Sequence, residues 1–130
     1  MLAASAIAKY KTVQVTTCSP GELLVMLYNG LFRFLGEAAN AIKSGDKAVA
    51  GERIGRSHDI LAELVAGLNP AHAPELCDNL QAIYMFCMGR IVEANLYQDA
   101  KRIEEVVRIL TPLREAWTIA VRGQPAPQKT

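Results

Sequence analysis

The chain has 130 residues, which suffices for a single domain with one hydrophobic core. Its composition, 51% hydrophobic and 21% charged, excludes an intrinsically disordered chain. A formal net charge of +1 gives no electrostatic reason to expect nucleic acid or an anionic membrane as a partner. The N-terminus lacks the pattern of a secretory signal, and no uncharged stretch approaches the ~20 residues of a membrane span. We therefore expect a cytoplasmic protein with reduced cysteines and no membrane insertion.

Residues 1–18 are predicted to form an N-terminal arm. Their apolar residues, among them Ile7 and Tyr10, show no helical spacing. The arm ends where the sequence Ser19-Pro20-Gly21-Glu22 has the pattern of a helix start. Ser19 suits the N-cap, Pro20 the first helical position, and Glu22 can close a capping box.

Turn residues divide the following chain, 19–122, into four segments of helical length. The helices are expected at about 20–43, 47–68, 74–96 and 99–122, and residues 123–130 have the composition of a flexible tail. Gly45 suits the left-handed residue that ends the first helix, and Asp46 can cap the second. Because the links are short and no window alternates like a strand, we predict an all-α, antiparallel, up-down-up-down four-helix bundle.

The first and third helices carry more apolar residues than a bundle core needs. On the first, Val25, Tyr28 and Phe32 are predicted to lie on a flank that the core does not fully cover. On the third, Leu80, Tyr84, Cys87 and Ile91 form the expected core line. Four more residues of that helix are predicted to lie beside the core or outside it: Met85, Met88 and Val92 on an apolar flank, and Phe86 toward water. Two interpretations stand: the arm covers these flanks, or they form a groove that binds an apolar helix or an extended segment.

Several segments together resemble the FliS family of flagellar export chaperones. The family's opening is similar to residues 10–23, which include the Ser-Pro-Gly-Glu start, followed by Met26-Leu-Tyr-Asn-Gly30 and Arg33-Phe34. Later helices continue the resemblance in the same order, with Ile60-Leu-Ala-Glu-Leu64, Arg90-Ile-Val-Glu-Ala-Asn95 and Leu113-Arg-Glu-Ala-Trp117. It covers about residues 7 to 120.

The resemblance implies a cytoplasmic chaperone that is not an enzyme and needs no cofactor. Such a protein would bind the disordered C-terminal segment of flagellin, prevent its premature polymerisation and aid its delivery to the export apparatus. Further candidate partners are the export gate, a co-chaperone and, in the free protein, a second copy. In the family the arm packs on the bundle where the client also binds, which adds two arm residues to the flanks. The candidate partner-binding residues are therefore Ile7, Tyr10, Val25, Tyr28, Phe32, Met85, Phe86 and Met88.

Two other functions compete with this interpretation. A general helix-binding adaptor would use the same apolar flanks. A histidine phosphotransfer domain would use His58, because such domains expose a histidine on a four-helix bundle. Leu61 and Ala62 stand where those domains usually have lysine and glycine, which favours an ordinary surface histidine. No paired-cysteine, Glu-x-x-His or His-Glu-x-x-His spacing occurs, so no metal site is expected.

Overall fold

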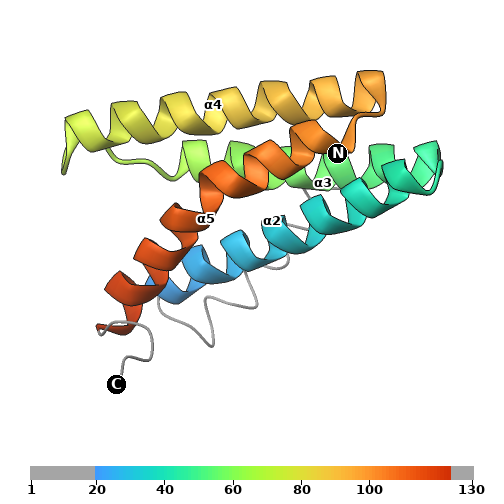
Figure 1. The fold of residues 1–130 in the computed structure, drawn as a ribbon. Helices are drawn as coiled ribbons and strands as arrows, with labels where there is room; N and C mark the ends of the chain where they lie inside the picture. The colour runs from blue at the N-terminus through green and yellow to red at the C-terminus, as the bar shows by residue number, and fades with distance from the viewer. Residues whose placement is uncertain (1–19, 124–130) are drawn as a thin grey trace.

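The computed structural model describes residues 20–123, all helical apart from short links and caps (Figure 1). Its helices are α2 (Pro20–Lys43), α3 (Lys47–Ala66), α4 (Pro74–Tyr97) and α5 (Ala100–Arg122). No strand occurs in this range, and none of these helices is long and apolar enough to cross a membrane. The predicted arm, with Ile7 and Tyr10, and most of the predicted tail lie outside the described residues.

The helix ends differ from the predicted ones by at most two residues. Asp46 caps α3 by accepting a hydrogen bond from the Val49 amide at 3.1 Å, and Gly45 before it is left-handed with φ +81°. α3 ends at Ala66, two residues early: the Gly67 amide makes the last bond to a carbonyl four residues back, Glu63, and the next amide, of Leu68, bonds Val65 only three residues back. α4 runs one residue further than predicted, to Tyr97, before Gln98 takes a left-handed conformation.

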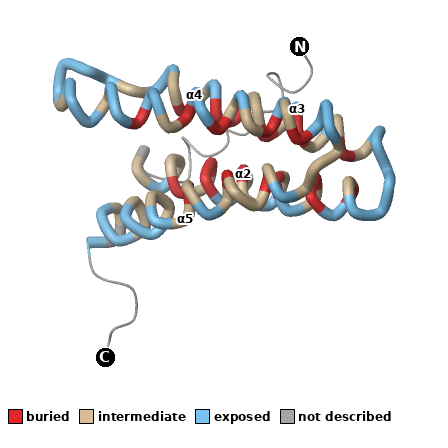
Figure 2. The backbone as a smooth tube through the Cα atoms, turned by 45° about the horizontal axis from the view of Figure 1, so that its top comes forward, coloured by how far each residue is buried: buried red, intermediate tan, exposed pale blue. Residues whose placement is uncertain are grey.

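The four helices form a ring in which each one packs against two others. α2 and α4 both lie between α3 and α5, whereas the diagonal pairs α2–α4 and α3–α5 are not in backbone contact. Figure 2 shows α3 and α4 in one layer above α2 and α5, with the buried positions turned inward. The predicted all-α four-helix bundle is therefore confirmed.

Buried side chains from all four helices form one core. Burial of a large apolar side chain contributes about 1.5–3 kcal/mol, so these residues supply most of the stability. α2 and α5 approach so closely at one end that a Cβ on Gly21 would lie 3.0 Å from Val121 Cγ2. The largest fully buried apolar residues are Leu31, Leu35, Leu61, Ile91, Ile103 and Leu110.

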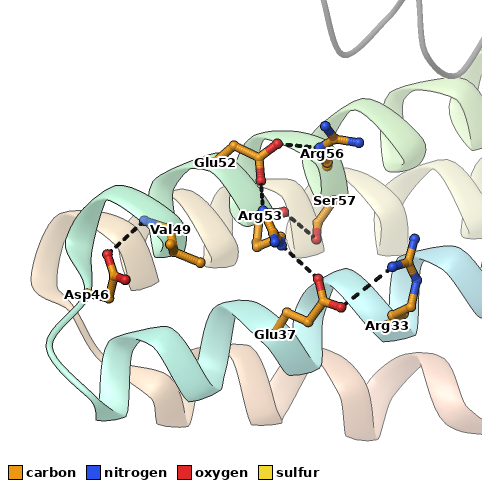
Figure 3. A network of polar contacts seen from close by, with 8 residues as sticks. All are labelled: Arg33, Glu37, Asp46, Val49, Glu52, Arg53, Arg56 and Ser57. Carbon is orange, nitrogen blue, oxygen red and sulfur yellow. Dashed lines mark hydrogen bonds and ion pairs between the residues drawn. The ribbon is translucent and has the colours of Figure 1, made fainter.

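A network of charged side chains covers the outer face between α2 and α3 (Figure 3). Arg53 bonds Glu37 across the two helices with Nε 2.7 Å from Oε1. Glu52 binds both Arg53 and Arg56, and Arg56 lies one helical turn further along α3. The hydrogen bond from Arg56 holds the pKa of the Glu52 carboxyl below its usual value. The charged side chains of this face thus bind one another.

Candidate partner-binding surface on α4 and α5

The large hydrophobic side chains that stay exposed gather on α4. Among residues 20–123 there are seven of them, of which six belong to α4 and one, Ile119, to α5. A soluble protein rarely exposes a contiguous apolar patch unless the patch binds something. The concentration on one helix therefore indicates an interaction surface. The six on α4 are Leu76, Met85, Phe86, Val92, Leu96 and Tyr97.

Contacts with the neighbouring helices show which way each side of α4 faces. Arg90 points toward α5, where its Nη2 lies 2.9 Å from Glu105 Oε1. Asn95, on another side of the helix, lies beside α3, with Oδ1 3.8 Å from the position that a Cβ would take on Gly51. These two contacts fix the orientation of all other α4 residues, because successive side chains turn by about 100°.

The exposed apolar residues of α4 fall on two different sides. One set lies on the side of Arg90 and is called here the α5-side flank: Leu76, Ile83 and Phe86. The other set, called the outer stripe, points away from the core and from α5: Met85, Gly89, Val92 and Leu96. Phe86 and Met85 are neighbours in sequence and almost equally exposed, at 49% and 52%, yet they belong to different surfaces.

α4 and α5 are joined at one end and separate at the other. Ion pairs from Arg90 to Glu105 and from Glu93 to Arg102 join the helices close to the turn between them. Toward the start of α4 and the end of α5 the two helices diverge (Figure 1). We call residues 74–88 of α4 and 113–122 of α5 the open end. Because the two helices are antiparallel, the α5-side flank of α4 faces the region where α5 has moved away.

At the open end, α5 also carries apolar residues. Leu113 and Trp117 pack partly buried against the core, and Ile119 is exposed. Pro112 lies just before them, within α5, where it has no amide hydrogen to donate. Ile119 follows Trp117 by two residues, a turn of about 200°, so it points to the side of α5 opposite the core. The exposed hydrophobic side chains at the open end therefore come from α4, and the part of α4 from Asn79 to Gly89 contains no charged residue.

Two tyrosine hydroxyls meet in the interior behind the open end. Tyr28 of α2 and Tyr84 of α4 are hydrogen bonded across the diagonal of the bundle, with the two oxygens 2.5 Å apart and the rings edge to face. Burial, and then the bond to Tyr84, raises the pKa of Tyr28, and burial also raises that of Tyr84. The buried Nε1 of Trp117 on α5 has no hydrogen-bond partner among the described residues.

The predicted site residues divide into three groups. The expectation that Val25 and Tyr28 lie on an uncovered flank is wrong, because both are buried. Tyr28 reaches across the core to Tyr84 of α4. Phe32 is half-buried beneath the Arg114 guanidinium, 4.1 Å from its ring centre. The third group comes from α4, where Met85 and Phe86 are exposed and Met88 packs partly buried on the core. Whether any of these residues contacts a partner stays a prediction.

The list of candidate partner-binding residues missed five exposed apolar residues: Leu76, Val92, Leu96, Tyr97 and Ile119. Leu96 continues the spacing of Met85 and Val92, so the outer stripe could have been found by extending that spacing to the helix end. Ile119 could have been placed on the outer side of α5 from its position two residues after Trp117. The exposure of Leu76 could not have been found from spacing. It depends on the divergence of α4 from α5, which no pattern within α4 encodes. Tyr97 was expected in a turn, yet it is the last residue of α4.

The nucleophilic and titratable side chains do not form a catalytic centre in the described part. Cys87 is buried, and this burial raises the pKa of its thiol to about 12. Cys77 is half-buried, and both thiols are free. His58 lies half-buried on α3. Residues 20–123 contain no group of three or more His, Cys, Asp or Glu side chains placed to hold a metal ion.

Comparison with known proteins identifies the family. The family described as "Flagellar protein FliS" matches residues 3–124. The flagellar secretion chaperone FliS of Bacillus subtilis is 35% identical over 115 residues, which cover 88% of this chain and 85% of that protein. The chaperone of the same name from Salmonella typhimurium is 34% identical over 122 residues, or 90% of each chain. The resemblance found in the sequence is thereby confirmed, and the chain belongs to the FliS family of flagellar proteins.

Proposed function

We propose that this protein is a cytoplasmic export chaperone that binds the disordered C-terminal segment of flagellin. Membership of the FliS family and the name "Flagellar secretion chaperone" of its relatives support this role. The main observation in support is the open end, where α4 diverges from α5 and presents apolar side chains that the bundle does not cover. No catalytic step is needed, because covering the client's own apolar residues prevents it from polymerising.

A disordered client must gain enough contact to offset the cost of its ordering. Leu76 and Phe86 are 50% and 49% exposed, so covering both contributes about 1 kcal/mol each. Ordering a segment that folds on binding costs about 2–5 kcal/mol. The two quantities nearly cancel, and association has a further entropic cost. The client therefore extends beyond the open end, with Phe32, Met88 and the arm residues Ile7 and Tyr10 as further proposed contacts.

Two neighbouring residues of α4 allow a matched test of the client site. We expect Phe86→Ala, on the α5-side flank, to weaken binding of the cognate flagellin C-terminal segment about tenfold, as for an interface aromatic. Met85→Ala removes a similarly exposed side chain from the outer stripe and should leave the affinity unchanged. Titration calorimetry with the wild type and both variants measures these affinities.

This test distinguishes an error in the proposed function from an error in the proposed binding site. If the wild type forms no complex with any cognate flagellin segment at micromolar concentrations, the flagellin proposal is wrong and a general helix-binding adaptor replaces it. If Met85→Ala and Phe86→Ala weaken binding equally, the client does not distinguish the two surfaces of α4, and the assignment to the open end is wrong.

Delivery requires that the chaperone also meet the export machinery. We propose that the export gate or a co-chaperone binds the complex on a surface that the client leaves free. The α2–α3 face in Figure 3 is already saturated with internal ion pairs, so a partner there would have to compete with them. Pull-down of the client complex with the cytoplasmic part of the export gate tests this contact, and an equal signal without the chaperone would refute it.

A further inference from the structure

Pro112 interrupts α5 at an exposed position near the middle of the helix. It has no amide hydrogen, so the carbonyl of Arg108, four residues back, receives no bond from this position, and the proline ring crowds that carbonyl. The preceding residue, Thr111, donates its hydroxyl to the Val107 carbonyl at 2.6 Å, a contact that also bends helices. Both features give α5 a reason to bend here, and its second half diverges from α4 (Figure 1).

The side of α5 on which Pro112 lies gives the direction of the bend. Because the proline ring crowds the preceding turn, a helix opens on the side of a proline and bends away from it. Pro112 follows Glu105 by seven residues, nearly two full turns, so both lie on one side of α5. Glu105 faces α4, where its Oε1 lies 2.9 Å from Arg90 Nη2. The bend therefore turns the second half of α5 away from α4.

The contacts of α5 agree with this direction. Within residues 20–123, the ion pairs that join α5 to α4 all lie before Pro112. After it, the Arg114 guanidinium lies over the ring of Phe32 on α2, 4.1 Å from the ring centre. Val121 is nine residues beyond Pro112, on the opposite side of the helix, and a Cβ on Gly21 of α2 would lie 3.0 Å from it. The second half of α5 thus packs on α2.

A straight α5 would cover the α5-side flank of α4 itself. The two ion pairs between these helices share one antiparallel register, since moving three residues along α4 corresponds to moving three back along α5. Continued in a straight line, this register places Pro112 level with Ile83 of the flank. Ala116 lies eleven residues, about three turns, after Glu105 on the same side of α5, and it is exposed. The bend therefore leaves both facing surfaces uncovered.

We propose that Pro112 is the positioning residue of the client site: it turns the second half of α5 from α4 to α2 and so keeps the α5-side flank open to a client. This inference rests on the proposed function, because it explains how the site assigned there stays accessible. Pro112 itself need not contact the client. A proline in a helix interior lowers stability relative to alanine, and the fold alone gives no reason to keep one at this exposed position.

Pro112→Ala tests this assignment, because alanine supplies the missing amide and favours a straight helix. We expect the variant to unfold at a higher urea concentration than the wild type, yet to bind the flagellin C-terminal segment at least about tenfold more weakly. Glu115→Ala, at an exposed position in the same half of α5, is the matched control and should leave the affinity unchanged. Urea unfolding and titration calorimetry measure the two quantities. Opposite changes in stability and affinity distinguish a positioning role from a purely structural one.

A second measurement needs no client. Leu76 of the α5-side flank is 50% exposed in the wild type, so Leu76→Ala should leave the urea midpoint almost unchanged. A straight α5 would cover Leu76, so the same truncation should lower the midpoint in the Pro112→Ala background. The full chain is used in all four proteins, and the difference between the two backgrounds reports whether α5 has moved.

The outcomes separate the role of Pro112 from the proposed function. An equal effect of Leu76→Ala in both backgrounds overturns the proposal, because α5 has then not moved. Parallel losses of stability and affinity in Pro112→Ala also overturn it, and so does a client affinity equal to that of the wild type. If the wild type binds no flagellin segment, the proposed function is wrong, and the unfolding experiment still decides whether Pro112 keeps the flank open.

Discussion

The outer surfaces of α3 and α4 differ although both helices bury one line of residues in the same core. α3 exposes no large hydrophobic side chain, and its outer positions carry Glu52, Arg53 and Arg56, which bind one another and α2. α4 exposes six large hydrophobic side chains. The bundle needs only the buried line of each helix, so the surplus on α4 does not serve the fold. We propose that it marks the part of the molecule that meets partners.

Truncating one leucine on each helix tests this difference in stability most directly. Leu61 on α3 is fully buried and Leu76 on α4 is 50% exposed. We expect Leu61→Ala to lower the free energy of unfolding by about 2–5 kcal/mol, and Leu76→Ala to change it by no more than about 0.5 kcal/mol. Urea unfolding followed by circular dichroism measures both. Similar losses in the two variants would mean that the surface of α4 does stabilise the fold.

The next prediction concerns the one direct hydrogen bond between the side chains of α2 and α4. Tyr84→Phe removes the hydroxyl that bonds Tyr28 in the interior, which should cost about 1–3 kcal/mol of unfolding free energy. Because no hydroxyl then loses its partner, the double variant Tyr28→Phe, Tyr84→Phe should be more stable than Tyr84→Phe alone. A double variant less stable than either single one would contradict this.

The same pair predicts a loss of stability at alkaline pH. Burial raises the pKa of Tyr28 above its ordinary value of 10.0, so the folded state holds a proton that the unfolded state releases. The stabilisation is complete below pH 10 and is lost as the pH rises above it. Urea unfolding at pH 8 and at pH 11 should show a smaller decline in the double Phe variant than in the wild type. Burial of Cys87 acts in the same direction from pH 9, so both proteins are compared in a Cys87→Ala background.

Short-range sequence patterns predicted where the helices lie, but not every contact between them. Gly45, Asp46 and Pro74 end or start helices through their own backbone conformation and short-range hydrogen bonds. The helix limits could therefore be predicted within two residues. The core line of α4 followed from its spacing. Tyr28 was misplaced because its burial depends on Tyr84, 56 residues away. The open end was missed because packing between the helices decides which side of α5 faces α4.

The smallest expected effect lies on the charged face of α3. Glu52→Gln removes a carboxylate that binds Arg53 and Arg56, but its side chain is 43% exposed, and water and salt screen such pairs. We expect a loss of no more than about 0.5 kcal/mol of unfolding free energy in low salt, and less in 1 M salt. The pKa of Glu52 is lowered from 4.5, so its contribution is present above pH 4.5 and is lost as the pH falls. Unfolding at pH 7 and at pH 3 should therefore show a difference between wild type and variant only at pH 7. A loss of more than 2 kcal/mol would mean that the charged face of α3 stabilises the bundle as strongly as a core residue does. The outer surface of α3 would then be a major source of stability, and the contrast drawn with α4 would have to be revised.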